Sequence, residues 1–234
     1  MQKFAFYTLF IACATLLSCT HKPSKVELLR LEKQHQDSVE YCQAQQTLRY
    51  SDSILQTLLP QSDEQLKLFR YEKNEDFEDY GHYVHRLLTT GSNTSRNFLQ
   101  AYVSDNRKTT IQCFYYGAHP QNQLHVRLSV GDLYIEKEGS NHAFEAEGWH
   151  EILTVESQDA IDILHFVSSH AQERIRVTMD GKNCVQYYLN QQEKQALTDT
   201  YQLAVLMNDI DQLERAIRVA SLQIQKFQKH HDLQ

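Results

Sequence analysis

LAVLMNDIDQLERAIRVASLQIQKF, residues 203–227, carries the clearest periodic pattern in the chain. Apolar residues recur in it at alternating spacings of three and four, as at the a and d positions of a coiled coil. Over four heptads, all eight seam positions are apolar: Leu203, Leu206, Ile210, Leu213, Ile217, Ala220, Ile224 and Phe227. Because such a seam has to be covered by another helix, we expect residues 191–230 to form a coiled-coil helix.

The nearest partner is a second helix, which the sequence predicts over residues 24–60. The seam spacing is repeated only in its second half, at Tyr41, Ala44, Leu48, Ser51, Leu55 and Leu58. Pro60 ends the run, because a helix interior accommodates proline poorly. We expect the two helices to pair antiparallel. The part of the seam that this helix does not match leaves a second copy of the chain or another protein open as a partner.

Residues 61–190, between the two helices, are predicted to form a β-rich domain. Leu124–Val130 alternates apolar with polar residues, which is typical of a half-buried strand. Other short segments rich in β-branched and aromatic residues are 83–89, 97–104, 109–116, 133–138, 142–148, 151–155, 174–179 and 184–189. An amphipathic helix capped by Ser157 is expected over 158–171. The fold class is therefore α+β, with two long terminal helices flanking a β-rich domain that contains one internal helix.

The N-terminus has the order of a secretory signal peptide. Lys3 precedes an apolar run from Phe4 to Leu17, and Leu16-Leu17-Ser18-Cys19 follows the pattern of a lipobox. The run has about 14 residues, fewer than the ~20 that a membrane-spanning helix needs, so a cleaved peptide over 1–18 is favoured over a retained helix.

This segment resembles the signal peptides of bacterial lipoproteins. The resemblance implies cleavage between Ser18 and Cys19, a diacylglycerol on the Cys19 sulfur and a fatty acid such as palmitate on its new amino group. Cys13, which follows Phe10-Ile11-Ala12, is the rival site, and ordinary secretion with an unmodified Cys19 is the other alternative. Residues 19–23 would then be a lipidated tether.

The residues after the cysteine bear on the destination. Thr20 stands where lipoproteins retained in the inner membrane have aspartate, and no acidic cluster follows. By analogy with lipoproteins we expect a lipid-anchored protein of the cell envelope, at the outer membrane and facing the periplasm.

A second resemblance covers most of residues 70–225. At Tyr83-Val84-His85-Arg86, 93–103, Tyr115-Tyr116-Gly117, 175–188 and 199–204 the chain is similar to a group of Bacteroidota envelope lipoproteins. The resemblance implies an envelope location and the order helix, β domain, helix. It implies no catalytic or binding residue.

The composition and the motifs argue against several functions. A formal net charge of −7 offers no electrostatic footprint for nucleic acid. No nucleophile elbow and no phosphate-binding glycine loop occurs in the sequence. Two sets of candidate metal-binding or catalytic residues remain, and neither is placed as a site requires. His82 and His85, near Asp79, fall on opposite faces of a strand, and Glu145 and Glu147 fit a solvated strand face. We therefore predict no catalytic residue, no metal site and no cofactor, and a protein that is not an enzyme.

Three cysteines remain if Cys19 is acylated. Cys113 and Cys184 lie in predicted strands and allow a bridge, while buried free thiols are the expected state.

The function predicted from the sequence is a membrane-anchored, non-enzymatic interaction or structural module. Its partners are the membrane, through the lipid anchor, and an envelope protein or a second copy, through the C-terminal helix. The alternative is a lipoprotein that binds glycans or peptidoglycan fragments on a platform drawn from Tyr115, Tyr116, Tyr187, Tyr188 and Trp149. Consecutive aromatic residues in a strand point to opposite faces, so at most one of each tyrosine pair joins such a platform.

Overall fold

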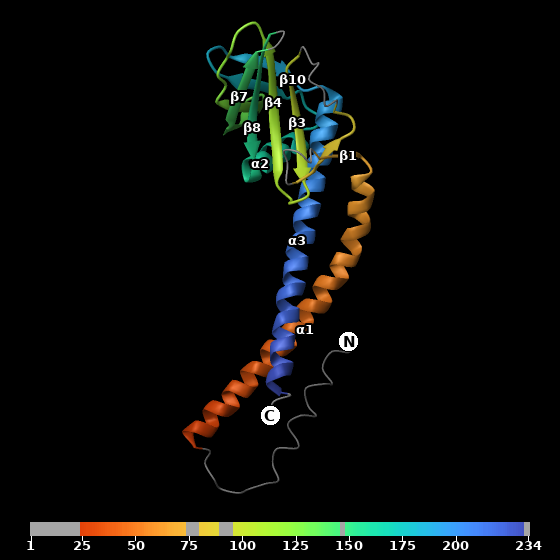
Figure 1. Cartoon of the computed structure of the whole chain (residues 1–234), viewed down its shortest axis with the longest axis vertical. Helices are drawn as coiled ribbons and strands as arrows, with labels where there is room; N and C mark the ends of the chain where they lie inside the picture. Colours follow the sequence, from red (N-terminus) through yellow and green to blue (C-terminus); the bar gives the residue numbers. More distant parts are fainter. Residues whose placement is uncertain (1–23, 74–79, 89–95, 146–147, 232–234) are drawn as a thin grey trace. The chain divides into compact units, whose positions relative to one another are not determined.

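The computed structural model describes residues 24–73, 80–88, 96–145 and 148–231 (Figure 1). The predicted signal peptide and tether, with Ser18 and Cys19, lie outside these residues. The α+β class is confirmed, with a long helix at each end, two sheets and an internal helix. The chain divides into a helical unit, made of the residues up to Thr47 and from Ala220 onwards, and a β unit, Leu48–Val219.

Two long helices contribute to both units, α1 (Lys25–Leu66) and α3 (Gln191–His231). The C-terminal helix was predicted to within one residue. The predicted end of the N-terminal helix at Pro60 is wrong, because α1 continues to Leu66. Proline in a helix interior removes one hydrogen bond and costs about 3 kcal/mol. The helix continues because Leu58 before the proline and Ser62 after it both lie on its covered side.

Each long helix begins with a capping box, in which two side chains satisfy free backbone N–H groups reciprocally. At α1 the Ser24 hydroxyl accepts a hydrogen bond from the backbone N–H of Glu27, with N and O 3.2 Å apart. The Glu27 carboxylate accepts one from the backbone N–H of Ser24, with N and O 3.4 Å apart. At α3 Asn190 and Glu193 make the same exchange, with both distances 2.9 Å. Among the helices of the described residues, none is both long enough and apolar enough to cross a membrane.

The β unit contains two antiparallel sheets. The six-stranded sheet has the order β1 (Phe69–Glu72), β2 (His82–His85), β3 (Phe98–Ser104), β4 (Thr109–Gly117), β8 (Trp149–Glu156) and β7 (Ser140–Glu145). The four-stranded sheet has the order β10 (Val185–Tyr188), β9 (Arg176–Asp180), β5 (His125–Val130) and β6 (Leu133–Glu138). The chain passes from one sheet to the other at Gly139, where a Cβ atom would lie 2.6 Å from the Thr154 carbonyl oxygen.

The core of the β unit lies between the two sheets. Strand β4 contributes Ile111 and Cys113. The alternation predicted for Leu124–Val130 is confirmed in part: Val126 and Leu128 are buried and Arg127 is exposed, but Ser129 is buried and Leu124 is exposed. Helix α2 (Ser157–Ser169) and the first turns of α3 close this core (Figure 1). The buried residues of α2 are Ala160, Ile163, Leu164 and Val167.

Two predictions about local structure need correction, and one strand was missed. Strand β1 was not predicted, and the strand expected over 83–89 is β2, which ends at His85. Helix α2 ends two residues early and has Glu156 at its N-cap, with no side-chain cap hydrogen bond. The free thiols expected for Cys113 and Cys184 are confirmed, but only Cys113 is buried, because Cys184 is exposed. Burial raises the pKa of the Cys113 thiol, so it stays protonated.

The turn between β3 and β4 holds α3 against the β unit. Arg107, in this turn, pairs with Asp211 and lies 2.7 Å from a carboxylate oxygen of Glu214. Within the β unit, α1 leads into β1 while α3 runs away from the sheets, so the two helices run in opposite directions (Figure 1).

Candidate functional site

The structure places the whole predicted seam on the covered side of α3. Leu203, Ile210 and Ala220 are buried, and the other five seam residues are half-buried. All six residues of α1 that repeat the spacing between 41 and 58 are also buried or half-buried. In the β unit, Leu203 packs in a cluster with Phe69 and Val103. The seam of α3 is therefore covered by other residues of the same chain.

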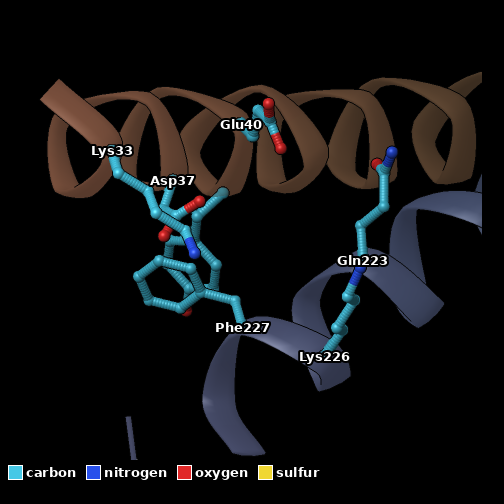
Figure 2. A pocket seen from close by; sticks show the side chains of 7 residues that line it. Lys33, Asp37, Glu40, Gln223, Lys226 and Phe227 are labelled. Atoms are coloured by element: carbon cyan, nitrogen blue, oxygen red, sulfur yellow. The ribbon is translucent and has the colours of Figure 1, made fainter. Parts of the chain in front are cut away.

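In the helical unit the seam ends in a ring contact. The rings of Tyr41 and Phe227 stack with centroids 4.4 Å apart. A groove of about 310 Å³ lies beside them, lined by Lys33, Asp37, Glu40, Tyr41, Gln223, Lys226 and Phe227. Figure 2 shows that α1 and α3 each contribute side chains to it. Two lysines face two carboxylates in this groove, so it has no net charge to select a charged ligand.

A polar junction joins α1, β2 and α3 in the β unit. His85 Nε2 lies 3.0 Å from a carboxylate oxygen of Asp199, and His85 Nδ1 accepts the N–H of Leu87 at 3.1 Å. The backbone carbonyl of Asp199 accepts a hydrogen bond from the Gln65 side chain at 3.2 Å. Paired histidine and aspartate are two members of a catalytic triad. Here Nδ1 is occupied by the Leu87 N–H, Nε2 lies against the Asp199 carboxylate and His85 is only 3 % exposed, so the pair acts as a structural contact.

The protonation of His85 should make the stability of the fold depend on pH in the acid range. Burial, opposed by Asp199, lowers the pKa of His85 below the ordinary 6.5. The unfolded chain then takes up the proton first, so stability is complete above pH 6.5 and falls as the pH drops through the lowered folded pKa. We expect His85→Gln to lose less stability than the parent between about pH 7 and pH 5, measured by denaturant unfolding. The exposed His142, changed to Gln, is the control and should keep the parent slope; equal slopes for both variants would contradict the prediction.

Glu151 has no exposed surface and forms the centre of a second polar cluster. Its carboxylate accepts the backbone N–H groups of Gln121, Asn122 at 2.9 Å and Gln123 at 3.0 Å, and the side-chain amide of Asn141 at 3.0 Å. Burial alone would raise the pKa of Glu151, but these four donors outweigh it and lower the pKa. The carboxylate therefore stays charged and holds the segment before β5 in place.

Of the residues weighed for catalysis or metal binding, those that the structure describes, His82, His85 and Glu145, are not brought together as a site. His82 packs against the Tyr102 ring, on the opposite face of β2 from His85, and Asp79 lies outside the described residues. Glu145 is exposed at the end of β7, and Glu147 lies outside the described residues. No group of three or more His, Cys, Asp and Glu in the described part of the chain is placed to hold a metal ion.

The predicted aromatic platform is divided by the fold. Tyr115 is buried, and Tyr187 packs against the core. The ring of Tyr188 lies under the guanidinium of Arg174 at 3.8 Å, and Trp149 is half-buried. Only Tyr116 points to the outer face of the six-stranded sheet.

Tyr116 belongs to a different group of rings, which we call the aromatic ladder: Tyr116, His150, Phe144 and His142. The Phe144 and His150 rings stack with centroids 5.0 Å apart and planes 4° apart, and Tyr116 lies 5.0 Å from His150. Phe144 is 42 % exposed. The sequence analysis missed His150 and Phe144, although the spacing of two between His142 and Phe144 places their side chains on one strand face.

Comparison with known proteins assigns no family. No protein-family model and no curated protein matches the chain. One solved structure with partial similarity is that of the mycobacterial trehalose monomycolate transport factor A. It is 13 % identical, the match covers 67 % of this chain and 95 % of that chain, and the TM-score is 0.20. Similarity this low carries no conclusion about fold or function.

Proposed function

We propose that the protein is a lipoprotein of the cell envelope that acts as a non-enzymatic interaction or structural module. The observation that supports this most is the use made of its buried ionisable groups. His85 and Asp199 join helices to a sheet, and the Glu151 carboxylate fastens a loop. These are the residue types that an active site would use, and in the β unit they are committed to holding the fold together.

The proposed module has an anchor at Cys19, two paired helices and a β unit. Because α1 covers the seam, a partner protein or a second copy that binds α3 would use its outward side. Val205 and Val219, which are 38 % and 55 % exposed, lie there. The proposed place of the protein is the outer membrane, facing the periplasm.

The anchor is tested by substituting Cys19. We expect Cys19→Ala to abolish labelling of the protein by radioactive palmitate and to release it from the membrane fraction, because acyl chains then no longer hold it. Cys13→Ala is the matched control and should leave both labelling and fractionation unchanged. If the Cys19→Ala protein is still labelled, or if the Cys13→Ala protein is no longer labelled, the lipid is attached to a residue other than Cys19.

The interaction role is tested by crosslinking the lipidated protein in living cells and identifying its partners by mass spectrometry. A reproducible envelope protein linked to α3 or to the β unit supports an adaptor. Links confined to the chain itself contradict the interaction role.

The aromatic ladder favours a second candidate, the binding of glycans or peptidoglycan fragments. Flat, partly exposed rings on a rigid sheet suit stacking against sugar rings, and an exposed apolar patch suggests binding. Phe144→Ala should remove any thermal stabilisation that an oligosaccharide confers on the protein, while Tyr188→Ala on the other sheet should retain it. A flat response of the parent protein across a broad panel would exclude this candidate.

A further inference from the structure

Helix α1 begins with a group of exposed apolar side chains, which we call the apolar tip: Val26, Leu28, Leu29 and Leu31. Their exposed fractions are 77 %, 46 %, 58 % and 55 %. They lie within six consecutive residues of the first two turns. None of them belongs to the series that covers the seam of α3, which begins at Tyr41. These side chains therefore lie outside the part of α1 whose spacing matches the seam, and all four are exposed.

We infer that the apolar tip inserts into the surface of the lipid bilayer in which the protein is anchored. This inference rests on the proposed lipidation of Cys19. The arguments for a bilayer, rather than another helix, come from the distribution of the four side chains, from the length of chain before them and from the charges beside them.

The distribution of the tip residues does not suit a helical partner. Successive residues of an α-helix are about 100° apart around the axis, so positions 26, 28, 29 and 31 lie on all sides of it. A partner helix covers one stripe of apolar residues. A bilayer surrounds a helix end and covers every side at once. In addition, Cα–Cβ bonds tilt toward the N-terminus of a helix, so the four side chains lean toward the end that follows the anchor.

The chain before the tip is short. Val26 is seven positions after Cys19, and an extended chain of seven Cα–Cα steps spans at most about 25 Å. A lipidated Cys19 lies at the membrane surface, so the tip stays close to that surface. Because the anchor keeps the local concentration of lipid around the tip high, a weak preference of the four side chains for lipid is sufficient for insertion.

The charges beside the tip complement an anionic surface. Over residues 25–33 the basic side chains of Lys25, Arg30 and Lys33 outnumber the carboxylates of Glu27 and Glu32, in a chain whose formal net charge is −7. Basic side chains extend toward lipid headgroups while their stems cover apolar surface. Of these two carboxylates, Glu27 is held in the capping box with Ser24. That box also satisfies backbone N–H groups, which would otherwise oppose entry into an apolar medium.

The test uses the full-length lipidated protein in vesicles of phosphatidylethanolamine and phosphatidylglycerol. A Trp149→Phe background removes the one native tryptophan. Leu29→Trp then reports on the tip, and Tyr50→Trp reports on a 70 % exposed position further along α1. We expect the emission of the Leu29→Trp protein to shift to the blue and to be quenched by lipids with brominated acyl chains. Tyr50→Trp should do neither, and Leu31→Trp repeats the measurement at a second tip residue.

Each alternative has a distinct result. Mass spectrometry of the same samples reports whether Cys19 carries lipid; if it does not, both the proposed anchor and this inference fail. If Cys19 is lipidated but neither tip variant is quenched, the tip remains in water and only the inference fails. A blue shift without quenching that grows with protein density in the membrane would identify a second copy as the cover, which also overturns the inference.

Discussion

Glu151→Ala is expected to lower the free energy of unfolding by about 3–5 kcal/mol, the largest effect that we predict for one side chain. The change removes the acceptor of three backbone N–H groups and of the Asn141 amide. Donors that are buried without a partner cost about 1–3 kcal/mol each, and partial entry of water relieves part of that sum. Denaturant unfolding, followed by circular dichroism, measures the loss.

The pH dependence of the same residue separates charge from packing. Because the pKa of Glu151 is lowered in the folded state, its contribution is present above the ordinary carboxyl pKa of 4.5 and is lost as the pH falls through the lowered value. Glu151→Gln, which has the same shape, should be less stable than the parent at neutral pH and should approach it in acid. If the free energies of unfolding of variant and parent, plotted against pH, stay parallel in acid, the carboxylate charge contributes nothing.

Leu203→Ala is expected to cost about 2–5 kcal/mol, the second large effect. Leu203 is fully buried against Phe69 and Val103, with Leu66 and Met207 beside them, and truncation leaves a cavity among these residues. The measurement is again the free energy of unfolding.

Leu222→Ala on the same helix is the matched control for Leu203. Leu222 is 60 % exposed and lies off the seam, so the same chemical change should alter stability by less than about 1 kcal/mol. Equal losses at the two positions would mean that the heptad pattern does not identify the covered side of α3.

The sequence predicted the elements well where one periodic signal dominates. The seam from Leu203 to Phe227 repeats for four heptads, and α3 follows it to within one residue of the predicted end. Strand β6 has the predicted ends, and in β5 the predicted alternation of buried and exposed side chains holds from Val126 to Leu128. Strand β1 was missed because its four residues are too few to establish a period. Pro60 misled the prediction because local propensity is a weaker influence than packing on both sides of it.

The polar clusters could not be predicted, because their members come from distant parts of the chain. Glu151 binds backbone groups 28 to 30 residues earlier, and those N–H groups have no signature in side-chain identity. His85 and Asp199 were each visible in the sequence, yet nothing local indicates that β2 lies against α3. The aromatic ladder is intermediate: one strand predicts His142 and Phe144 on a common face, but only the register of β8 brings His150 beside them.

The contact between Gln65 and Asp199 joins residues that are 134 positions apart. Ribosomes release a chain from its N-terminus at about 5–20 residues per second, so roughly 6–25 s pass between the appearance of Leu66 and that of Gln191. Throughout that interval the covered side of α1, with Leu48, Leu55 and Leu58, has no α3 to pair with. The nascent chain is thus most prone to pair with α1 of a neighbouring chain before its own α3 has been synthesised. Any factor that binds α1 during this interval protects the fold.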